Sequence, residues 1–162
     1  MAAEALKVRL QTVLARIRPD SVLIIGDALA PTIAALLGDR GAIAHLASTE
    51  ALERLPALGF HDLALVWADA ALSAEGAAVL LSRLRDIYAR KVLIIVPPAL
   101  DHAPWDRRSL IGLGFTPYGE ARATADEHLC LYQFDIATYK TTPDWLSPEN
   151  WANPELWDKY RW

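Results

Sequence analysis

The chain alternates between short aliphatic runs and longer segments whose apolar residues recur at helical spacing. Residues 22–25, 63–67 and 92–96 are almost entirely apolar, as is typical of strands buried on both faces, and residues 42–46 form a weaker run of the same kind. Residues 4–18, 31–37, 48–55 and 73–88 carry apolar side chains at helical spacing, which predicts helices. This alternation predicts right-handed crossovers and a mostly parallel sheet covered on both faces.

Capping residues and prolines give the expected ends of the later helices. Ser48 or Thr49 is expected to cap the helix that follows the weaker strand, and Pro56 to close it. Ser73 is expected to start the longest of the later helices. The spacing predicts that this helix buries one apolar stripe, made of Ala77, Leu80, Leu81, Leu84, Ile87 and Tyr88.

The last third of the chain changes character. A short helix near residues 107–113 is followed by Gly114 and Pro117, which fit the turn into two strands joined by a short polar connection and ending near residue 136. The predicted fold is therefore α/β: a Rossmann-like three-layer sandwich with a mostly parallel sheet and a C-terminal antiparallel hairpin. We expect one domain over residues 1–140 and a Trp- and Pro-rich extension over residues 141–162.

Composition excludes more function classes than it identifies. The 162 residues are 53% hydrophobic, the net charge is −4, and basic residues do not cluster, so nucleic-acid binding is disfavoured. The single cysteine, Cys130, lies in an apolar run and is expected to be a buried, inert thiol, and the scattered histidines predict no metal site. No run reaches the roughly 18 apolar residues of a membrane span, and the first residues are unlike a secretory signal, which favours a cytoplasmic protein.

The order of the predicted elements resembles the class I S-adenosylmethionine-dependent methyltransferase fold. Between residues 20 and 136, strand–helix units are followed by a helix, the turn Leu113-Gly114-Phe115 and a terminal hairpin, as in a shortened version that lacks one strand–helix unit from the middle. With its Trp-rich ending, the chain also resembles a small family of uncharacterised bacterial proteins. The methyltransferase resemblance implies a cofactor loop after the first strand and an acidic residue at the end of the second.

The loop after the first strand departs from the methyltransferase pattern. These enzymes resemble one another in a segment of the type V-L-(E/D)-x-G-x-G-x-G, whose glycines let the backbone approach the cofactor. Gly26 takes the first glycine position, but Ile24 stands at the acidic position, and Ala28 and Ala30 replace the later glycines. No carboxylate falls near His45, where the resemblance implies the ribose-binding acid. These departures disfavour ordinary binding of S-adenosylmethionine, the cofactor that the resemblance implies.

In an open α/β sheet, ligands bind outside the carboxyl ends of the parallel strands. The candidates for cofactor binding at this edge are Gly26, Asp27, Ala28, Ser48 and Trp67. The candidates for catalysis are Asp69, Asp101 and His102, with His102 as general base and one of the two carboxylates orienting it. We favour a structural alternative, in which Asp27 and Asp69 end strands and cap the following helices. The carboxylate of Asp27 also disfavours a phosphate ligand.

The segment 144–162 is the most distinctive part of the chain. It repeats the order capping residue, proline, acid and tryptophan at 147–151 and 153–157, and its tryptophans are Trp145, Trp151, Trp157 and Trp162. Because one aromatic side chain buries about 150–250 Å², these tryptophans need a surface to pack on. That surface is either their own domain or a protein partner or second subunit. The acidic residues of the segment disfavour a membrane surface.

Three functions remain open at this point. We favour a non-catalytic, methyltransferase-like domain that acts as a binding or assembly module, because the scaffold is kept while the cofactor loop is altered and an aromatic segment is added. The alternative is an S-adenosylmethionine-dependent methyltransferase with a divergent loop, in which Asp69, Asp101 or His102 lines the pocket. The third is an enzyme of another class that uses the same aspartates and histidine.

Overall fold

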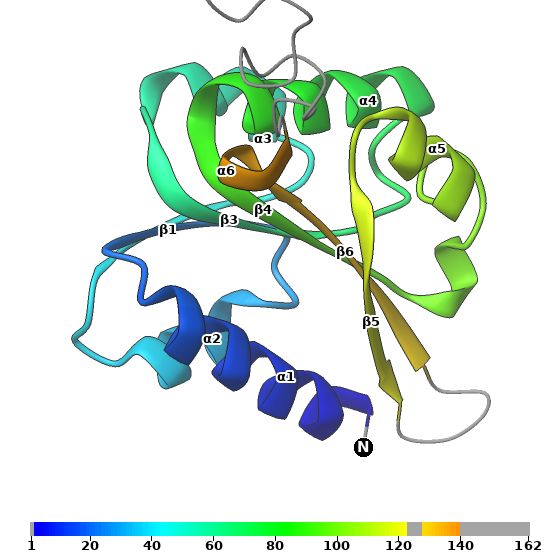
Figure 1. Ribbon diagram of the computed structural model, residues 1–162. Helices are drawn as coiled ribbons and strands as arrows, with labels where there is room; N and C mark the ends of the chain where they lie inside the picture. The colour runs from blue at the N-terminus through cyan, green and yellow to red at the C-terminus, as the bar shows by residue number, and fades with distance from the viewer. Residues whose placement is uncertain (1, 123–127, 140–162) are drawn as a thin grey trace, which may run out of the picture.

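The computed structural model describes residues 2–122 and 128–139 of the chain. Within these residues, six strands form one sheet in the order β2-β1-β3-β4-β6-β5 (Figure 1). The strands are β1 (Ser21–Ile25), β2 (Ala42–Leu46), β3 (His61–Trp67), β4 (Ala89–Val96), β5 (Thr116–Arg122) and β6 (His128–Asp135). β2, β1, β3 and β4 are parallel, whereas β6 runs antiparallel to both β4 and β5. The predicted mixed sheet with a C-terminal antiparallel hairpin is confirmed.

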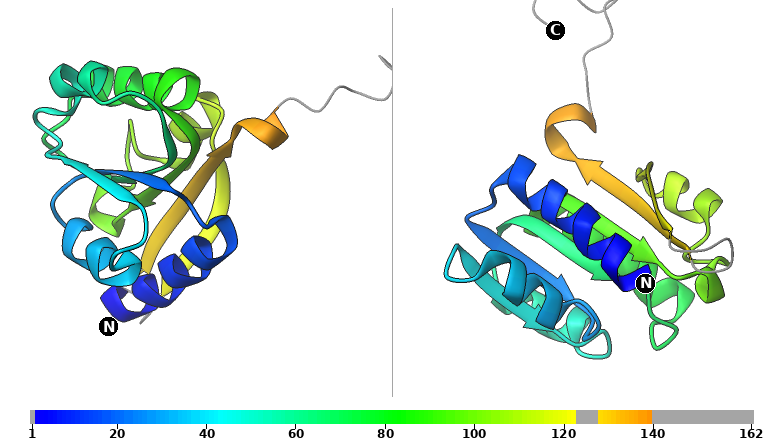
Figure 2. Two further views of the ribbon diagram at one scale, coloured as in Figure 1. Left: turned by 90° about the vertical axis from the view of Figure 1, so that its left-hand side faces the viewer. Right: turned by 90° about the horizontal axis from the view of Figure 1, so that it is seen from below.

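Helices cover both faces of this sheet and complete the three predicted layers. The α-helices are α1 (Ala2–Ile17), α2 (Ala30–Leu37), α3 (Ala51–Arg54), α4 (Ala74–Arg83), α5 (Arg107–Gly112) and α6 (Ile136–Tyr139). The shorter turns are the 3₁₀ segments η1 (Leu55–Ala57) and η3 (Pro98–Leu100) and the π segment η2 (Leu84–Tyr88). Figure 2 shows α1 and α2 on one side of the sheet and α3 and α4 on the other.

The two faces of the sheet carry two separate apolar cores. Val22 and Ile24 of β1 pack with α1 and α2, whereas Leu23 and Ile25 pack with α3, α4 and α5. Because successive side chains of a strand point to opposite faces, a strand between two helical layers must be apolar at every position. This requirement explains the unbroken aliphatic runs of the sequence.

Four details of the predicted elements were wrong. Neither Ser48 nor Thr49 caps α3, since Glu50 precedes that helix, and Pro56 lies inside η1 rather than closing the helix. The π segment η2 widens the helix after α4, and the side chain of Ile87 is 58% exposed instead of completing the buried stripe. Pro117 lies within β5 rather than in the turn before it. β5 is an edge strand of the sheet, and an edge strand tolerates proline because it has a neighbouring strand on one side only.

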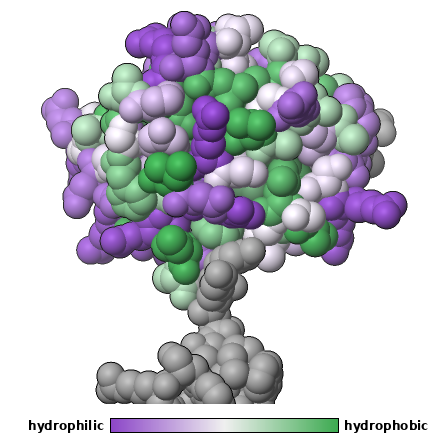
Figure 3. All heavy atoms as spheres, turned by 90° about the horizontal axis from the view of Figure 1, so that it is seen from above, coloured by the Kyte–Doolittle hydropathy of each residue, from purple (hydrophilic) through white to green (hydrophobic). Residues whose placement is uncertain are grey.

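The outer face of α3 and α4 shows how such exposed apolar groups are distributed. In Figure 3, which looks onto this face, hydrophobic areas are separated by polar side chains.

Among the described residues, no helix has the length and apolar character that a membrane span requires. The segment with Trp145, Trp151, Trp157 and Trp162 lies outside the described residues.

Candidate functional site

The carboxyl ends of β1, β2 and β3 bring Gly26, Ser48 and Trp67 into one cluster. Gly26 follows β1, has a φ of +104°, and donates its N–H to the carbonyl of Leu46 at 3.0 Å. A Cβ atom on Gly26 would lie 2.9 Å from the Cβ of Trp67 and 3.7 Å from the Oγ of Ser48. Trp67 therefore packs directly against the open side of the glycine. Both the backbone angle and this contact require the absence of a side chain at position 26.

Ser48 contributes a hydroxyl that the fold leaves unsatisfied. The residue is 4% exposed, and its Oγ has no hydrogen-bond partner among the described residues. A buried polar group without a partner costs about 1–3 kcal/mol. Beside Gly26 and Trp67, the Ser48 hydroxyl is thus a buried polar group without a partner among the described residues.

Asp27 forms an ion-pair contact that the sequence did not indicate. Its Oδ1 lies 3.1 Å from the Nε2 of His45, and the two side chains are 79% and 39% exposed, respectively. The prediction that Asp27 caps the next helix was wrong, because Leu29 precedes α2 and no side chain caps it. Ala28 is exposed beside this pair. The signal for the pair was present in the parallel alignment of β1 with β2, which places the end of one strand beside the end of the other.

Asp69 is used to shape the turn after β3. Its Oδ1 accepts a hydrogen bond from the backbone N–H of Ala71 at 2.9 Å. The cap of α4 is Ser73 instead, whose Oγ accepts from the N–H of Gly76 at 3.0 Å. The expectation that Asp69 caps the helix was therefore wrong.

Asp101 and His102 lie on the exposed connection between η3 and α5. The Nδ1 of His102 lies 3.2 Å from the carbonyl oxygen of the adjacent Ala103. Within the part of the chain that the structure describes, no hydrogen bond or ion pair joins His102 to Asp69 or Asp101. A shallow cavity of about 570 Å³ lies beside this connection, lined by Asp101, Asp106, Arg107, Arg108 and Ile111.

Cys130 and Tyr132 were not foreseen near this edge. β6 pairs antiparallel with β4, so that Cys130 lies opposite Val96, at the carboxyl end of β4. The side chain of Cys130 is partly buried rather than buried as expected. Burial raises the pKa of the Tyr132 hydroxyl, and the neighbouring Cys130 and Asp101 add to that rise. Among the described residues, no group of three or more His, Cys, Asp or Glu side chains is arranged to hold a metal ion.

The fold is that of a methyltransferase-like α/β domain. The methyltransferase domain of bacterial CtHen1-CN superposes with a TM-score of 0.62 at 12% identity, over 84% of this chain and 100% of that chain. The methyltransferase domain of bacterial CtHen1-C gives a TM-score of 0.57 at 12% identity, over 83% of this chain and 100% of that chain. At these identities the likeness is one of fold.

The sequence itself matches a family along nearly its whole length. Residues 4–162 match the family of unknown function DUF6231. The chain belongs to the DUF6231 family. No match is found among curated proteins. The resemblance to a class I methyltransferase fold is confirmed by the superpositions, and the family match covers the Trp-rich segment as well.

Proposed function

We propose that this domain keeps a methyltransferase scaffold as a non-catalytic binding or assembly module. The observation that carries the proposal is the contact between Gly26 and Trp67, in which a Cβ on the glycine would lie 2.9 Å from the tryptophan Cβ. In the methyltransferase pattern, glycines after the first strand leave room for a cofactor. Here the space directly beside the one retained glycine is taken by the Cβ and Cγ atoms of Trp67, at 2.9 and 3.7 Å from where a glycine Cβ would lie.

The polar groups around this contact support the same proposal. Asp27 faces His45, and Asp69 accepts the N–H of Ala71, so both carboxylates serve local structure. In the expected acid–base pair, a carboxylate would lie within hydrogen-bond reach of His102 and orient it. His102 contacts the carbonyl of Ala103 rather than a carboxylate. An acid–base pair built from these residues would require the connection between η3 and α5 to rearrange.

The second candidate function is an S-adenosylmethionine-dependent methyltransferase with a divergent loop. Ser48 favours it, because a buried hydroxyl without a partner beside Gly26 would gain one from a polar ligand. The fold shared with methyltransferase domains is compatible with either function.

A thermal-shift titration separates the two functions. S-adenosylhomocysteine and S-adenosylmethionine are added separately up to millimolar concentration, and the melting temperature of the full chain is recorded. A ligand at a hundred times its Kd stabilises a protein by about 2.7 kcal/mol, which for this size corresponds to roughly 5–11 °C. We expect no saturable rise with either compound. A saturable rise of several degrees, matched by heat in a calorimetric titration, would refute the non-catalytic proposal.

The assembly role extends to the Trp-rich segment. We propose that Trp145, Trp151, Trp157 and Trp162 supply contacts to a protein partner or a second copy of the chain. Tryptophan is enriched among the residues that dominate binding energy at protein interfaces. The family match supports treating this segment as part of the same unit, since it extends to residue 162.

A further inference from the structure

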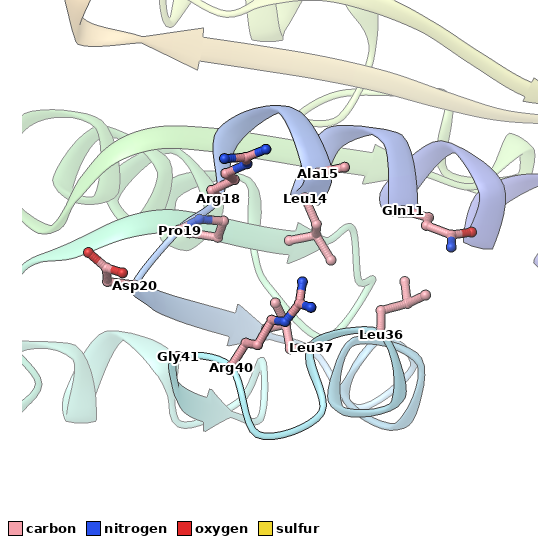
Figure 4. A pocket seen from close by; sticks show the side chains of 10 residues that line it. All are labelled: Gln11, Leu14, Ala15, Arg18, Pro19, Asp20, Leu36, Leu37, Arg40 and Gly41. Carbon is pink, nitrogen blue, oxygen red and sulfur yellow. The ribbon is translucent and has the colours of Figure 1, made fainter.

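A cavity of about 620 Å³ lies at the end of the sheet opposite to Gly26. It is formed where α1 and α2 end, beside the first residues of β1 and β2 (Figure 4). The cavity is lined by Gln11, Leu14, Ala15, Arg18, Pro19, Asp20, Leu36, Leu37, Arg40 and Gly41. Its volume falls within the range of about 300–1,000 Å³ that is usual for small-molecule sites. Neither methyltransferase-like chemistry nor the carboxyl edge of the sheet involves it.

The lining combines an apolar surface with two guanidinium groups. Leu14 and Leu37 come from the core between the sheet and the two helices. Within the described residues, neither Arg18 nor Arg40 has an ion pair or a side-chain hydrogen bond. Figure 4 shows Arg40 extending from the turn after α2 towards Leu14 of α1, while the carboxylate of Asp20 points away from Arg40.

The backbone of Arg18 gives an independent reason to look here. Its φ is +49°, which makes it the one non-glycine residue of the described chain with a positive φ. It stands just after α1, and its N–H donates to the carbonyl of Leu14 at 2.8 Å. Glycine usually fills this position after a helix, because a residue with a Cβ costs about 1–2 kcal/mol in the left-handed region. An arginine here carries that strain while its side chain lines the cavity.

The connection that carries Arg18 is fixed to the one that carries Arg40. Ala42 donates its N–H to the carbonyl of Asp20 at 2.9 Å, and the N–H of Asp20 donates to the Oδ2 of Asp62 at 2.9 Å. A Cβ on Gly41 would lie 2.9 Å from the same Asp20 carbonyl oxygen, so the two connections pass each other closely. The two arginines are therefore presented from a braced corner of the fold.

We propose that this cavity binds a small organic anion. Its oxyanion group binds Arg40, which reaches towards Leu14. It draws in the exposed side chain of Arg18 from the other rim of the cavity, where the Arg18 guanidinium points away from Arg40 (Figure 4). The apolar part of the anion rests on Leu36 and Leu37. Carboxylates, phosphates and sulfonates are the groups that guanidinium forks bind best. The free carbonyl groups at the end of α2 carry partial negative charge, and two of them already accept hydrogen bonds. The backbone N–H of Gly38 donates to the carbonyl of Ala34, and the backbone N–H of Arg40 donates to that of Leu37. The site is independent of the carboxyl edge and of the function proposed there.

The test uses 8-anilinonaphthalene-1-sulfonate, which carries a sulfonate and an apolar aromatic body. The full chain is titrated under native conditions, and binding is followed by the blue-shifted fluorescence of the probe. The variants are Arg18→Gly and Arg40→Gln, with Arg83→Gln as the control, because Arg83 is an exposed arginine of α4 on the other face of the sheet. All three remove one positive charge.

We expect saturable binding that weakens as the salt concentration rises. Arg18→Gly and Arg40→Gln each raise the Kd about tenfold to a hundredfold, as for loss of a hydrogen bond to a charged group, whereas Arg83→Gln leaves it within about twofold. Arg18→Gly keeps or raises the melting temperature, because glycine relieves the left-handed strain, so weaker binding by this variant does not come from unfolding. Absence of saturable binding, or equal affinities for all three variants, overturns the proposal.

Discussion

Replacing Gly26 with alanine tests how tightly the first-strand loop is filled. Two penalties apply at this position. The φ of +104° is unfavourable for any residue with a Cβ, at about 1–3 kcal/mol. The added methyl group would also lie 2.9 Å from the Cβ of Trp67, and overpacking of this kind costs about 1–3 kcal/mol. Gly26→Ala should therefore lower the free energy of unfolding by about 2–6 kcal/mol, the sum of these two ranges.

Two matched glycines separate the penalties. Gly38 and Gly59 also have positive φ values, of +55° and +74°, but a Cβ on either would meet nothing within 4 Å. Gly38→Ala and Gly59→Ala should thus lower the free energy of unfolding only by the cost of the positive φ. Urea unfolding of the three variants, with equal m-values as the check on two-state behaviour, gives the comparison. If Gly26→Ala loses no more than the two controls, Trp67 does not fill the space beside Gly26, and the main support for a non-catalytic function is gone.

Two further predictions concern Asp106, which directly precedes α5, and the Trp-rich segment. The hydrogen bond from Ser109 lowers the pKa of Asp106, so the folded state favours the charged carboxylate. Asp106→Asn should therefore lower the melting temperature at pH 7, by an amount that shrinks as the pH falls below about 4. A difference that stays constant as the pH falls would contradict this. A chain that ends at residue 143 should be a monomer of unchanged melting temperature in light scattering, whereas the full chain forms a larger assembly. A large loss of stability on truncation would show instead that the tryptophans pack on their own domain, since each indole buries about 150–250 Å², worth roughly 4–6 kcal/mol.

The sheet was predictable from the sequence because a strand between two helical layers leaves no choice of residue type. Val22, Leu23, Ile24 and Ile25 are all buried, and an unbroken aliphatic run of this length is a strong signal. The antiparallel hairpin followed from the short connection between its strands. The exposure of Ile87 could not be predicted, since the π turn that causes it changes the helical period by one residue locally.

The candidate site was predictable in position but not in its contacts. The rule that carboxyl ends of parallel strands gather at one edge placed Gly26, Ser48 and Trp67 together. It did not reveal that Trp67 faces the glycine or that Asp27 faces His45, because both contacts depend on the register and twist of neighbouring strands. The cavity with Arg18 and Arg40 lay outside this rule altogether. Its residues come from two helix ends and two loops, and no sequence period connects them.

Glycine occupies positive-φ positions at both ends of the sheet, and Arg18 is the exception among the described residues. At the carboxyl end, the position with a positive φ is a glycine, and the space this creates is occupied by Trp67, so conformation and packing account for each other. Ser48 alone is left without a partner there. At the amino end, Gly41 also has a positive φ, of +79°, whereas Arg18 adopts a φ of +49° while carrying a side chain. The turn at Arg18 lets its N–H close α1 on the carbonyl of Leu14, but glycine would do the same with less strain, so the choice of arginine points to a role of its side chain. On that ground, the amino end of this sheet is the better place to look for a ligand, even though parallel sheets usually bind theirs at the other.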